Sequence, residues 1–283
     1  MGWLPVARKE YAEHVRHAWV LAMSGIFLAL TLAASILAGS SATGVALAGM
    51  LPTILGMQAT IGFVLPILAL MLGFGTLAGE RESGSLGLLA AQPVTRGEIL
   101  WGKFAGLWAA LATAVLAGIG AASLLVMVRR GVDGAGAWQL VMFVFLTLLW
   151  AATWMAIAVL VSALFRTRAS AIGGALSVWF LFVVVWGVIE VLLLLAQFGT
   201  SALQTPQDLP PPWWLTLVEV LNPNSVYRDL LVTSLPGYRD FSSSLGAIVG
   251  APGFTPLTFA VGMAVWIALP LGAAFAIFSK RDL

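Results

Sequence analysis

Six long apolar stretches, separated by shorter polar segments, dominate the pattern of hydrophobic and polar positions along this chain. They run over Ala18–Ala38, Gln58–Ala78, Phe104–Val128, Gln139–Phe165, Ala171–Phe198 and Pro256–Phe278. Each is long enough for a helix that crosses a bilayer, which needs about 20 mostly apolar residues. The first stretch exceeds the apolar region of a secretory signal, about 7 to 15 residues, so we expect an uncleaved helix there. The pattern predicts an all-α membrane protein with six transmembrane helices, forming one domain over residues 1–283.

The segment before the first stretch, residues 1–17, has a different pattern. Apolar side chains recur on one stripe of a helix at Leu4, Ala7, Tyr11 and Val15, and charged or histidine side chains fill the rest. An amphipathic helix of this kind lies in the plane of a membrane surface. We therefore predict an interfacial helix that rests on the lipid bilayer and leads into the first span.

A long loop, residues 199–255, separates the fifth and sixth stretches and is too long for a plain connector. Helical spacing within it predicts two short helices on the outer face. The first would end at Asn222 and Pro223 and turn these apolar side chains toward the membrane: Trp214, Leu217, Val218 and Leu221. The second, over 224–232, would turn Val226, Leu230 and Leu231 down and leave Arg228 and Asp229 exposed.

Two interpretations of this loop stay open. It is either a lipid-resting cap that closes a dimer, or a docking platform for a periplasmic protein. We favour docking, because a cap does not require the additional segment 238–252. The candidate docking residues are Asn222, Pro223, Tyr227, Arg228 and Asp229.

Composition supports the membrane assignment and excludes several functions. Hydrophobic residues make up 60% of the chain and charged residues only 9%, against about 25% charged in soluble domains. The net charge of +2 is too small for a nucleic-acid-binding protein, and the absence of cysteine excludes disulfides and thiolate metal sites.

The basic residues fall mostly on one side of the predicted membrane. Placing the N-terminus inside puts ten there: Arg8, Lys9, Arg16, Arg81, Arg96, Lys103, Arg166, Arg168, Lys280 and Arg281. Arg129, Arg130, Arg228 and Arg239 fall outside. Because cytoplasmic loops carry the excess of Lys and Arg, both termini are expected in the cytoplasm.

The spans carry little chemistry of their own. The two histidines, His14 and His17, lie in the N-terminal helix, and two ligands make a poor metal site. Glu190 is the ionisable residue within a span, and we expect it near the outer edge rather than as a buried functional carboxylate. We therefore expect no catalytic residue, metal or cofactor in this chain, and energy supplied by a cytoplasmic partner.

Residues 79–103, between the second and third stretches, are the most informative polar segment. Glu80, Arg81 and Glu82 leave the second span, Ser83 and Gly84 break the helix, and Thr95 with Glu98 predicts a capping box. The glycine pair in GERESGSL has P-loop spacing, but Ser85 stands where a P-loop needs lysine. Two GxxxG pairs, Gly75 with Gly79 and Gly102 with Gly106, favour close packing of helices.

The short apolar turn inside this segment is either a knob that fits a groove of a partner protein or a hairpin on the lipid headgroups. The residues alone favour neither interpretation over the other. The candidate residues for coupling to an ATPase are Glu80, Arg81, Glu82, Gly84, Leu86, Leu88, Leu89 and Arg96.

The same segment resembles the linker between the second and third helices of type-2 ABC exporter permeases. That family has a GERESGT-like run, a short coupling helix and a PVSRGEILLGK-like run, and this chain has AGERESGS followed by QPVTRGEILWGK. The resemblance extends to ARKEYAEHVRHAWVLA near the N-terminus and to the tail ALPLGAAFAIFSKRDL. LNPNSVYRDLL, at Leu221–Leu231, is similar to the NPTDVYR-type stretch of NosY-type permeases, with Asn224 and Ser225 in place of Thr and Asp.

This resemblance implies a permease of the bacterial inner membrane that pairs with a second copy of itself. It implies cytoplasmic NosF-like ATPase subunits that bind ATP and Mg, and a periplasmic NosD-like protein on the outer face. NosY-type membership further implies a part in copper-site maturation of nitrous oxide reductase. The lack of Cys and the placement of both His argue against a liganded copper path through these helices.

Three alternatives remain beside this hypothesis. One is another type-2 exporter with a different substrate. The second is a secondary transporter or channel that works alone, and the third is an intramembrane enzyme or a structural anchor. Dependence on an ATPase separates the exporters from the second alternative.

Overall fold

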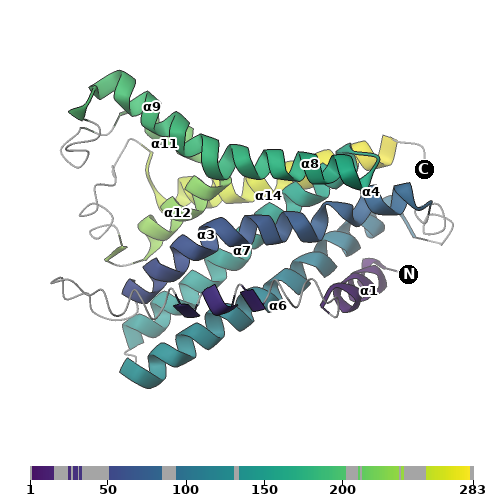
Figure 1. Cartoon of the computed structure of the whole chain (residues 1–283), viewed down its shortest axis with the longest axis horizontal. Coiled ribbons are helices and arrows are strands. Elements are labelled where there is room, and N and C mark those ends of the chain that lie inside the picture. The colour runs from purple at the N-terminus through teal and green to yellow at the C-terminus, as the bar shows by residue number, and fades with distance from the viewer. Residues whose placement is uncertain are drawn as a thin grey trace.

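The computed structural model describes residues 2–15, 25–26, 28–30, 32–33, 51–84, 94–130, 134–201, 210, 212–235, 237–238 and 253–280. These residues are almost entirely helical and contain no strand, which confirms the all-α prediction for the described part (Figure 1). Helix is the expected solution for such an apolar chain, because lipid offers no partners for free backbone groups.

Five long apolar helical segments correspond to predicted spans two to six. The second span consists of α3 (Leu51–Gly73) and α4 (Gly75–Glu82), and the third and fourth are α6 (Arg96–Arg130) and α7 (Gly134–Leu164). The fifth comprises α8 (Arg168–Trp179), the π-helix η1 (Phe180–Val185) and α9 (Trp186–Phe198), and the sixth is α14 (Pro256–Lys280). The predicted first span, Ala18–Ala38, lies largely outside the described residues, so the count of six stays a prediction.

Helix α7 forms the centre of the bundle. It packs against α3, α6 and α14, and the side chains of Trp150 and Trp154 are fully buried in it. Its last turns consist almost entirely of buried residues. The neighbouring helices α3, α6 and α14 therefore pack around α7, whose last turns are enclosed.

The fifth span is the least enclosed. It runs along one side of the bundle as a long, nearly continuous helix (Figure 1), and its most apolar window contains no buried residue. Val188 and Leu192 are more than half exposed. This face must be covered by lipid or by another protein chain, since apolar surface is unfavourable in water.

Helix α1 (Trp3–Val15) forms as predicted but packs differently. It lies against α6, with Ala7 and Glu10 buried, while Leu4 is 63% exposed. Ala7 of the predicted stripe therefore packs on α6, and contact of the exposed Leu4 with lipid stays a prediction. A buried carboxylate, Glu10, occupies the contact face because α6 presents a lysine there.

Two helices also form in the loop between the fifth and sixth spans, as α11 (Leu215–Val220) and α12 (Pro223–Ser234). In α12, Val226, Leu230 and Leu231 are buried as predicted, but Asp229 is buried too, against prediction. In α11 part of the predicted apolar stripe turns away from the bundle, so its contact with the membrane stays a prediction. Leu217 and Leu221 are exposed, and Leu215, Thr216 and Glu219 are buried. The reason is an ion pair that draws Glu219 toward α12.

Candidate functional site

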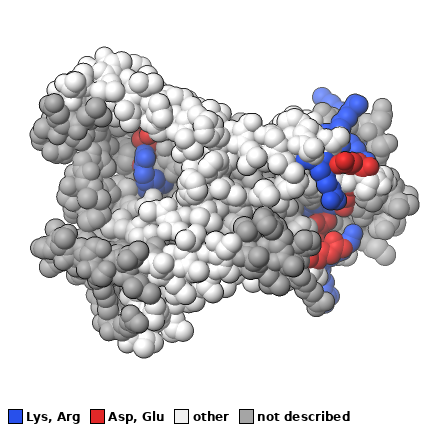
Figure 2. Space-filling model, in the orientation of Figure 1, with Lys and Arg blue, Asp and Glu red and all other residues white. Residues whose placement is uncertain are grey.

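Charged side chains gather at one end of the bundle, called the charged end below. It contains α1, the end of α4, the starts of α6 and α8, and the end of α14, with both chain termini nearby (Figure 1). Figure 2 shows basic and acidic side chains clustered there, and a smaller group in a hollow near the opposite end. The described basic residues of the charged end are Arg8, Lys9, Arg81, Arg96, Lys103, Arg166, Arg168 and Lys280.

A buried ion triad lies at the centre of the charged end. Lys103 Nζ lies 2.7 Å from Glu10 Oε1 and 2.7 Å from Glu80 Oε1. The lysine side chain is 1% exposed, and those of Glu10 and Glu80 are 6% and 20% exposed. A buried lysine needs such partners, because an unpaired charge away from water is very unfavourable. The triad ties α1, α4 and α6 together at one point.

Two glycines of α6 allow α1 to approach closely enough for this triad. A Cβ on Gly102 would lie 2.6 Å from Val6 Cβ, and one on Gly106 would overlap the Ala7 carbonyl oxygen and Glu10 Cβ. The Gly102–Gly106 pair therefore packs helices closely, as predicted, and does so within one chain. Of the other pair, Gly79 lies against the Arg168 side chain, whereas Gly75 has nothing within 4 Å.

The second span is interrupted at Phe74, between α3 and α4. Ser162 Oγ of α7 accepts hydrogen bonds from the backbone N–H groups of Leu77 and Ala78, at 2.8 and 3.0 Å. The first N–H groups of a helix lack partners within it, and this buried serine supplies one. The interruption is thus fixed against α7.

The end of α4 is tied to the connection between α7 and α8. Arg81 Nη1 donates to the Phe165 carbonyl oxygen at 2.8 Å, and the Arg168 backbone N–H donates to Glu82 Oε2 at 2.7 Å. Arg81 and Glu82 therefore contact the connection between α7 and α8, and Glu80 contacts Lys103 of α6. Their role in coupling stays a prediction.

The described edges of the 79–103 segment match the predicted breaks. Helix α4 ends at Glu82, and Gly84 has φ 74°, a left-handed conformation that favours glycine. The Thr95 backbone N–H donates to Glu98 Oε2 at 2.8 Å, and the Glu98 N–H to Thr95 Oγ1 at 3.2 Å, which confirms the capping box. Leu86, Leu88 and Leu89 lie outside the described residues.

Arg96 has a structural contact that was not foreseen. Its Nη1 donates to the carbonyl oxygens of Phe278 and Ser279, at 3.0 and 2.8 Å. These carbonyls belong to the last turn of α14, where a basic side chain is favourable. The segment is therefore also joined to the end of the last span.

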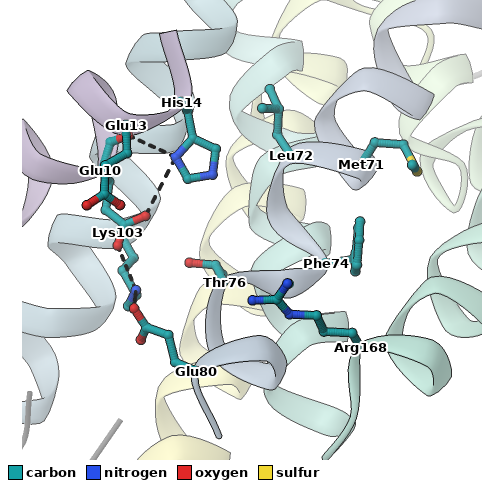
Figure 3. Close-up of a pocket in the computed structure, with 11 residues that line it drawn as sticks. Glu10, Glu13, His14, Met71, Leu72, Phe74, Thr76, Glu80, Lys103 and Arg168 are labelled. Atoms are coloured by element: carbon teal, nitrogen blue, oxygen red, sulfur yellow. Dashed lines mark hydrogen bonds and ion pairs between the residues drawn. The ribbon is translucent and has the colours of Figure 1, made fainter. Parts of the chain in front are cut away.

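A cavity of about 340 Å³ opens beside the triad, between α1, α3, α4 and the start of α8. Figure 3 shows its polar side chains, from Glu10, Glu13, His14, Thr76, Glu80, Lys103 and Arg168, and the apolar ones from Met71, Leu72 and Phe74. His14 Nδ1 lies 2.8 Å from the Glu10 carbonyl oxygen.

The candidate docking residues near the opposite end are mostly buried. Asn222 caps α12 by accepting from the Asn224 N–H at 2.9 Å, and Pro223 takes the first helical position. Tyr227 stacks on Trp150 at a centroid distance of 4.3 Å and shares a 2.7 Å hydrogen bond with Thr147. Their docking role is untested, but their present contacts hold α12 on α7.

Arg228 is the partly exposed member of this set, with its side chain 43% exposed. Its Nη2 lies 2.6 Å from Glu219 Oε2, and its Nε lies 3.0 Å from Asp229 Oδ1. Burial, with repulsion from Glu219 and Glu190, raises the pKa of Asp229 to about 7 despite the nearby arginine.

Glu190, in α9 of the fifth span, lies beside this cluster. Ser225 Oγ donates to Glu190 Oε1 at 3.1 Å, and both residues line a cavity of about 300 Å³ with Arg228. The carbonyl oxygen of Phe182, in the π-helix, accepts from Asn222 and Asn224 at 3.1 and 3.3 Å. Within the described residues, no three His, Asp or Glu side chains could hold a metal ion.

Three residues important at the charged end were not identified from the sequence: Glu10, Lys103 and Ser162. Glu10 follows the charged pattern of an exposed helix face. The sequence pattern places Lys103 only among the basic residues of the predicted inner side. A signal existed for Lys103, since it sits between two glycines that predict close packing, at Gly102 and Gly106.

Comparison with known proteins gives matches over nearly the whole chain. The family model described as ABC-2 family transporter protein matches residues 4–283. A protein of Stutzerimonas stutzeri named "Probable ABC transporter permease protein NosY" is 34% identical over 282 residues, covering 98% of this chain and 97% of that protein. A protein of the same name from Pseudomonas aeruginosa PAO1 is 30% identical over 285 residues, covering 98% of each.

Proposed function

This chain belongs to the ABC-2 family of transporter proteins, and from that premise we propose that it is the membrane subunit of an ATP-driven transporter whose ATPase is a separate cytoplasmic protein. The ATPase, and not this chain, would bind ATP and Mg. The charged end would be the cytoplasmic end, because it holds most of the basic residues. On this proposal, residues 79–103 receive the movement of the ATPase.

The observation that carries the proposal is the bridge between the two ends of this segment. Glu80 lies near the start of residues 79–103 and Lys103 at their end, and Lys103 Nζ lies 2.7 Å from Glu80 Oε1. Force on the segment would therefore reach α4 and α6 together, and α1 through Glu10. Interiors this closely packed transmit displacement rather than absorb it.

We further propose the NosY-type role for this chain. It would form a homodimer, work with NosF-like ATPase subunits and a NosD-like periplasmic protein, and take part in copper-site maturation of nitrous oxide reductase. The identity to two proteins named NosY supports this assignment, as does the LNPNSVYRDLL stretch. In this proposal the outer helices α11 and α12 present Arg228 to the periplasmic protein.

The coupling proposal can be tested by a substitution at Gly84. Gly84→Val forces a β-branched residue into a left-handed conformation within the segment, and we expect reduced ATP hydrolysis by the assembled complex with normal membrane insertion. Gly199→Val is the matched control, because Gly199 also has a positive φ, 60°, with nothing within 4 Å. Gly199 ends α9, away from the charged end.

The same measurement decides against the alternatives. If Gly84→Val assembles with the ATPase and keeps wild-type hydrolysis while Gly199→Val does the same, the segment only rests on lipid headgroups. If the purified chain transports or supports reductase maturation without any ATPase, it is a secondary transporter or channel. Copper content of the reductase in cells that carry each variant tests the NosY-type role separately.

A further inference from the structure

The cavity at the charged end contains a buried polar group with no partner. Thr76 is 6% exposed, and its Oγ1 has no hydrogen-bond partner among the described residues. Figure 3 shows this hydroxyl pointing into the cavity, between His14 and Arg168. Buried hydroxyl groups in native proteins nearly always have a partner, so the missing one is expected to come from a molecule in the cavity.

The second unassigned group is the guanidinium of Arg168. The backbone N–H of Arg168 donates to Glu82. Within the part of the chain that the structure describes, the Arg168 side chain makes no ion pair. The guanidinium lies over Gly79, where a Cβ would be 2.5 Å from Nε, and lines the cavity. Arginine is the side chain best suited to a phosphate, because its planar donors match the phosphate oxygens.

The remaining polar wall carries both signs of charge. His14 has Nδ1 directed at the Glu10 carbonyl oxygen, which leaves its other ring nitrogen for the cavity. Glu13 and Glu80 supply carboxylates on the same wall. Glu80 also keeps its 2.7 Å contact with Lys103, and Glu13 its 3.7 Å contact with Lys9. A plain anion would meet these acidic groups, whereas a molecule with a phosphate and an ammonium group would match both signs.

The apolar wall places the cavity at a membrane boundary. Met71, Leu72 and Phe74 line it, and they belong to a helical segment apolar enough to span a membrane. Interfacial helix α1 covers the cavity from the polar side. A ligand there has apolar surface on one side and charged groups on the other, as at the level of lipid headgroups.

From these contacts we propose that the cavity binds the headgroup of a zwitterionic, ethanolamine-type phospholipid. The phosphate contacts Arg168, His14 and the Thr76 hydroxyl, and the ammonium contacts Glu13 and Glu80. The acyl chains leave along Met71 and Leu72. A bound lipid would thereby join α1 to α4 and α8 beside the ion triad.

Native mass spectrometry of the full chain, stripped of lipid and supplied with defined lipids, tests the ligand class. Ethanolamine phospholipid should bind, glycerol phospholipid with the same acyl chains should bind more weakly, and free phosphoethanolamine should not be retained. Equal retention of the two lipids would overturn the zwitterionic site. If free phosphoethanolamine is retained in the absence of lipid, the cavity binds a small soluble molecule and the proposal of a phospholipid ligand is overturned.

Two variants test the site itself. Arg168→Gln should lower the affinity for ethanolamine phospholipid by about tenfold or more, the usual effect of losing a hydrogen bond to a charged group. Arg166→Gln is the matched control, an exposed arginine of the same connection that does not line the cavity. Equal loss in both variants, or none in either, would overturn the site.

Thr76→Val keeps the shape of the side chain and separates ligand binding from folding. If the hydroxyl binds a headgroup, this variant should be less thermally stable than the wild type in ethanolamine lipid only. If the hydroxyl has no ligand, the variant should be equally or more stable in every lipid, because an unpartnered buried polar group has been removed. That second result would overturn the proposal.

Discussion

Lys103 shows how one residue can decide the packing of three helices. Its ammonium lies between the carboxylates of Glu10 and Glu80, and water reaches only 1% of its side chain. A charge in such a place is tolerated only because both partners are within hydrogen-bond distance. The pattern of charges alone suggests a solvated lysine at this position.

At the residue scale, we expect Lys103→Met to lower the free energy of unfolding by about 3 kcal/mol, because two carboxylates lose their buried counter-ion. The control is Lys9→Met, since Lys9 pairs with Glu13 at 3.7 Å with both side chains more than half exposed. Its expected effect is below about 0.5 kcal/mol. Denaturant unfolding in detergent measures both, and equal losses would contradict a special role for Lys103.

Asp229 gives a pH prediction at the same scale. Its ordinary pKa of 3.8 is raised to about 7 in the folded chain. The folded state therefore holds a proton that the unfolded state has released, and stability from this group is lost as pH rises from about 4 through about 7. The midpoint temperature of thermal unfolding should decrease as the pH is raised from about 4 to about 7. Asp229→Asn should remove most of that decrease. A midpoint that rises with pH in the wild type would mean that attraction to Arg228 exceeds the burial effect.

At the scale of elements, α1 is positioned by the shape of α6 as much as by charge. Gly102 and Gly106 leave the surface of α6 open, and the backbone of α1 fills that space. Larger side chains there would separate the helices and with them the Lys103–Glu10 pair. The N-terminal helix is thus a packed part of the bundle.

We expect Gly106→Ala to displace α1, because the added Cβ would overlap the Ala7 carbonyl oxygen. A single cysteine at Ala7, which is 7% exposed, should then react faster with a maleimide. Gly120→Ala in the same helix is the control, because nothing lies within 4 Å of its Cβ position. Unchanged labelling in Gly106→Ala would show that α1 tolerates the extra carbon by a small shift.

At the scale of the whole molecule, the fifth span is the face best suited to a second copy. The proposed homodimer needs a large apolar surface, and α9 presents Val188 and Leu192 one turn apart, at 55% and 58% exposure. Helix α6 also exposes an apolar residue, Leu124 at 62%, on another side. The apolar window of the fifth span contains no buried residue, whereas 44% of the window in α6 is buried, which favours the fifth span.

Cysteine crosslinking distinguishes the two faces, because the sequence contains no cysteine of its own. Val188→Cys and Leu192→Cys should each give a covalent dimer in native membranes, and Leu124→Cys should not. Crosslinks from Leu124→Cys alone would place the interface on α6. A dimer that persists in native gels without any crosslink would place it on a third surface.

The sequence by itself determined the membrane class, the positions of five spans, the helix break at Ser83–Gly84, the Thr95–Glu98 capping box and the family. These features depend on local composition and spacing, since long apolar runs must become helices in lipid and caps involve residues three apart. The resemblance of 79–103 to type-2 ABC exporter permeases is confirmed by the family match.

The tertiary structure alone decided which polar groups meet. Glu10 and Lys103 are 93 residues apart in the chain, and Ser162 is 85 residues from the N–H group of Leu77. Periodicity places a residue on a helix face, but it does not say which neighbour that face will contact. A charged residue opposite a complementary one is therefore buried, as Glu10, Glu219 and Asp229 are. The sequence pattern alone predicts exposure for Asp229 and places Glu10 among the charged side chains outside the apolar stripe of its helix.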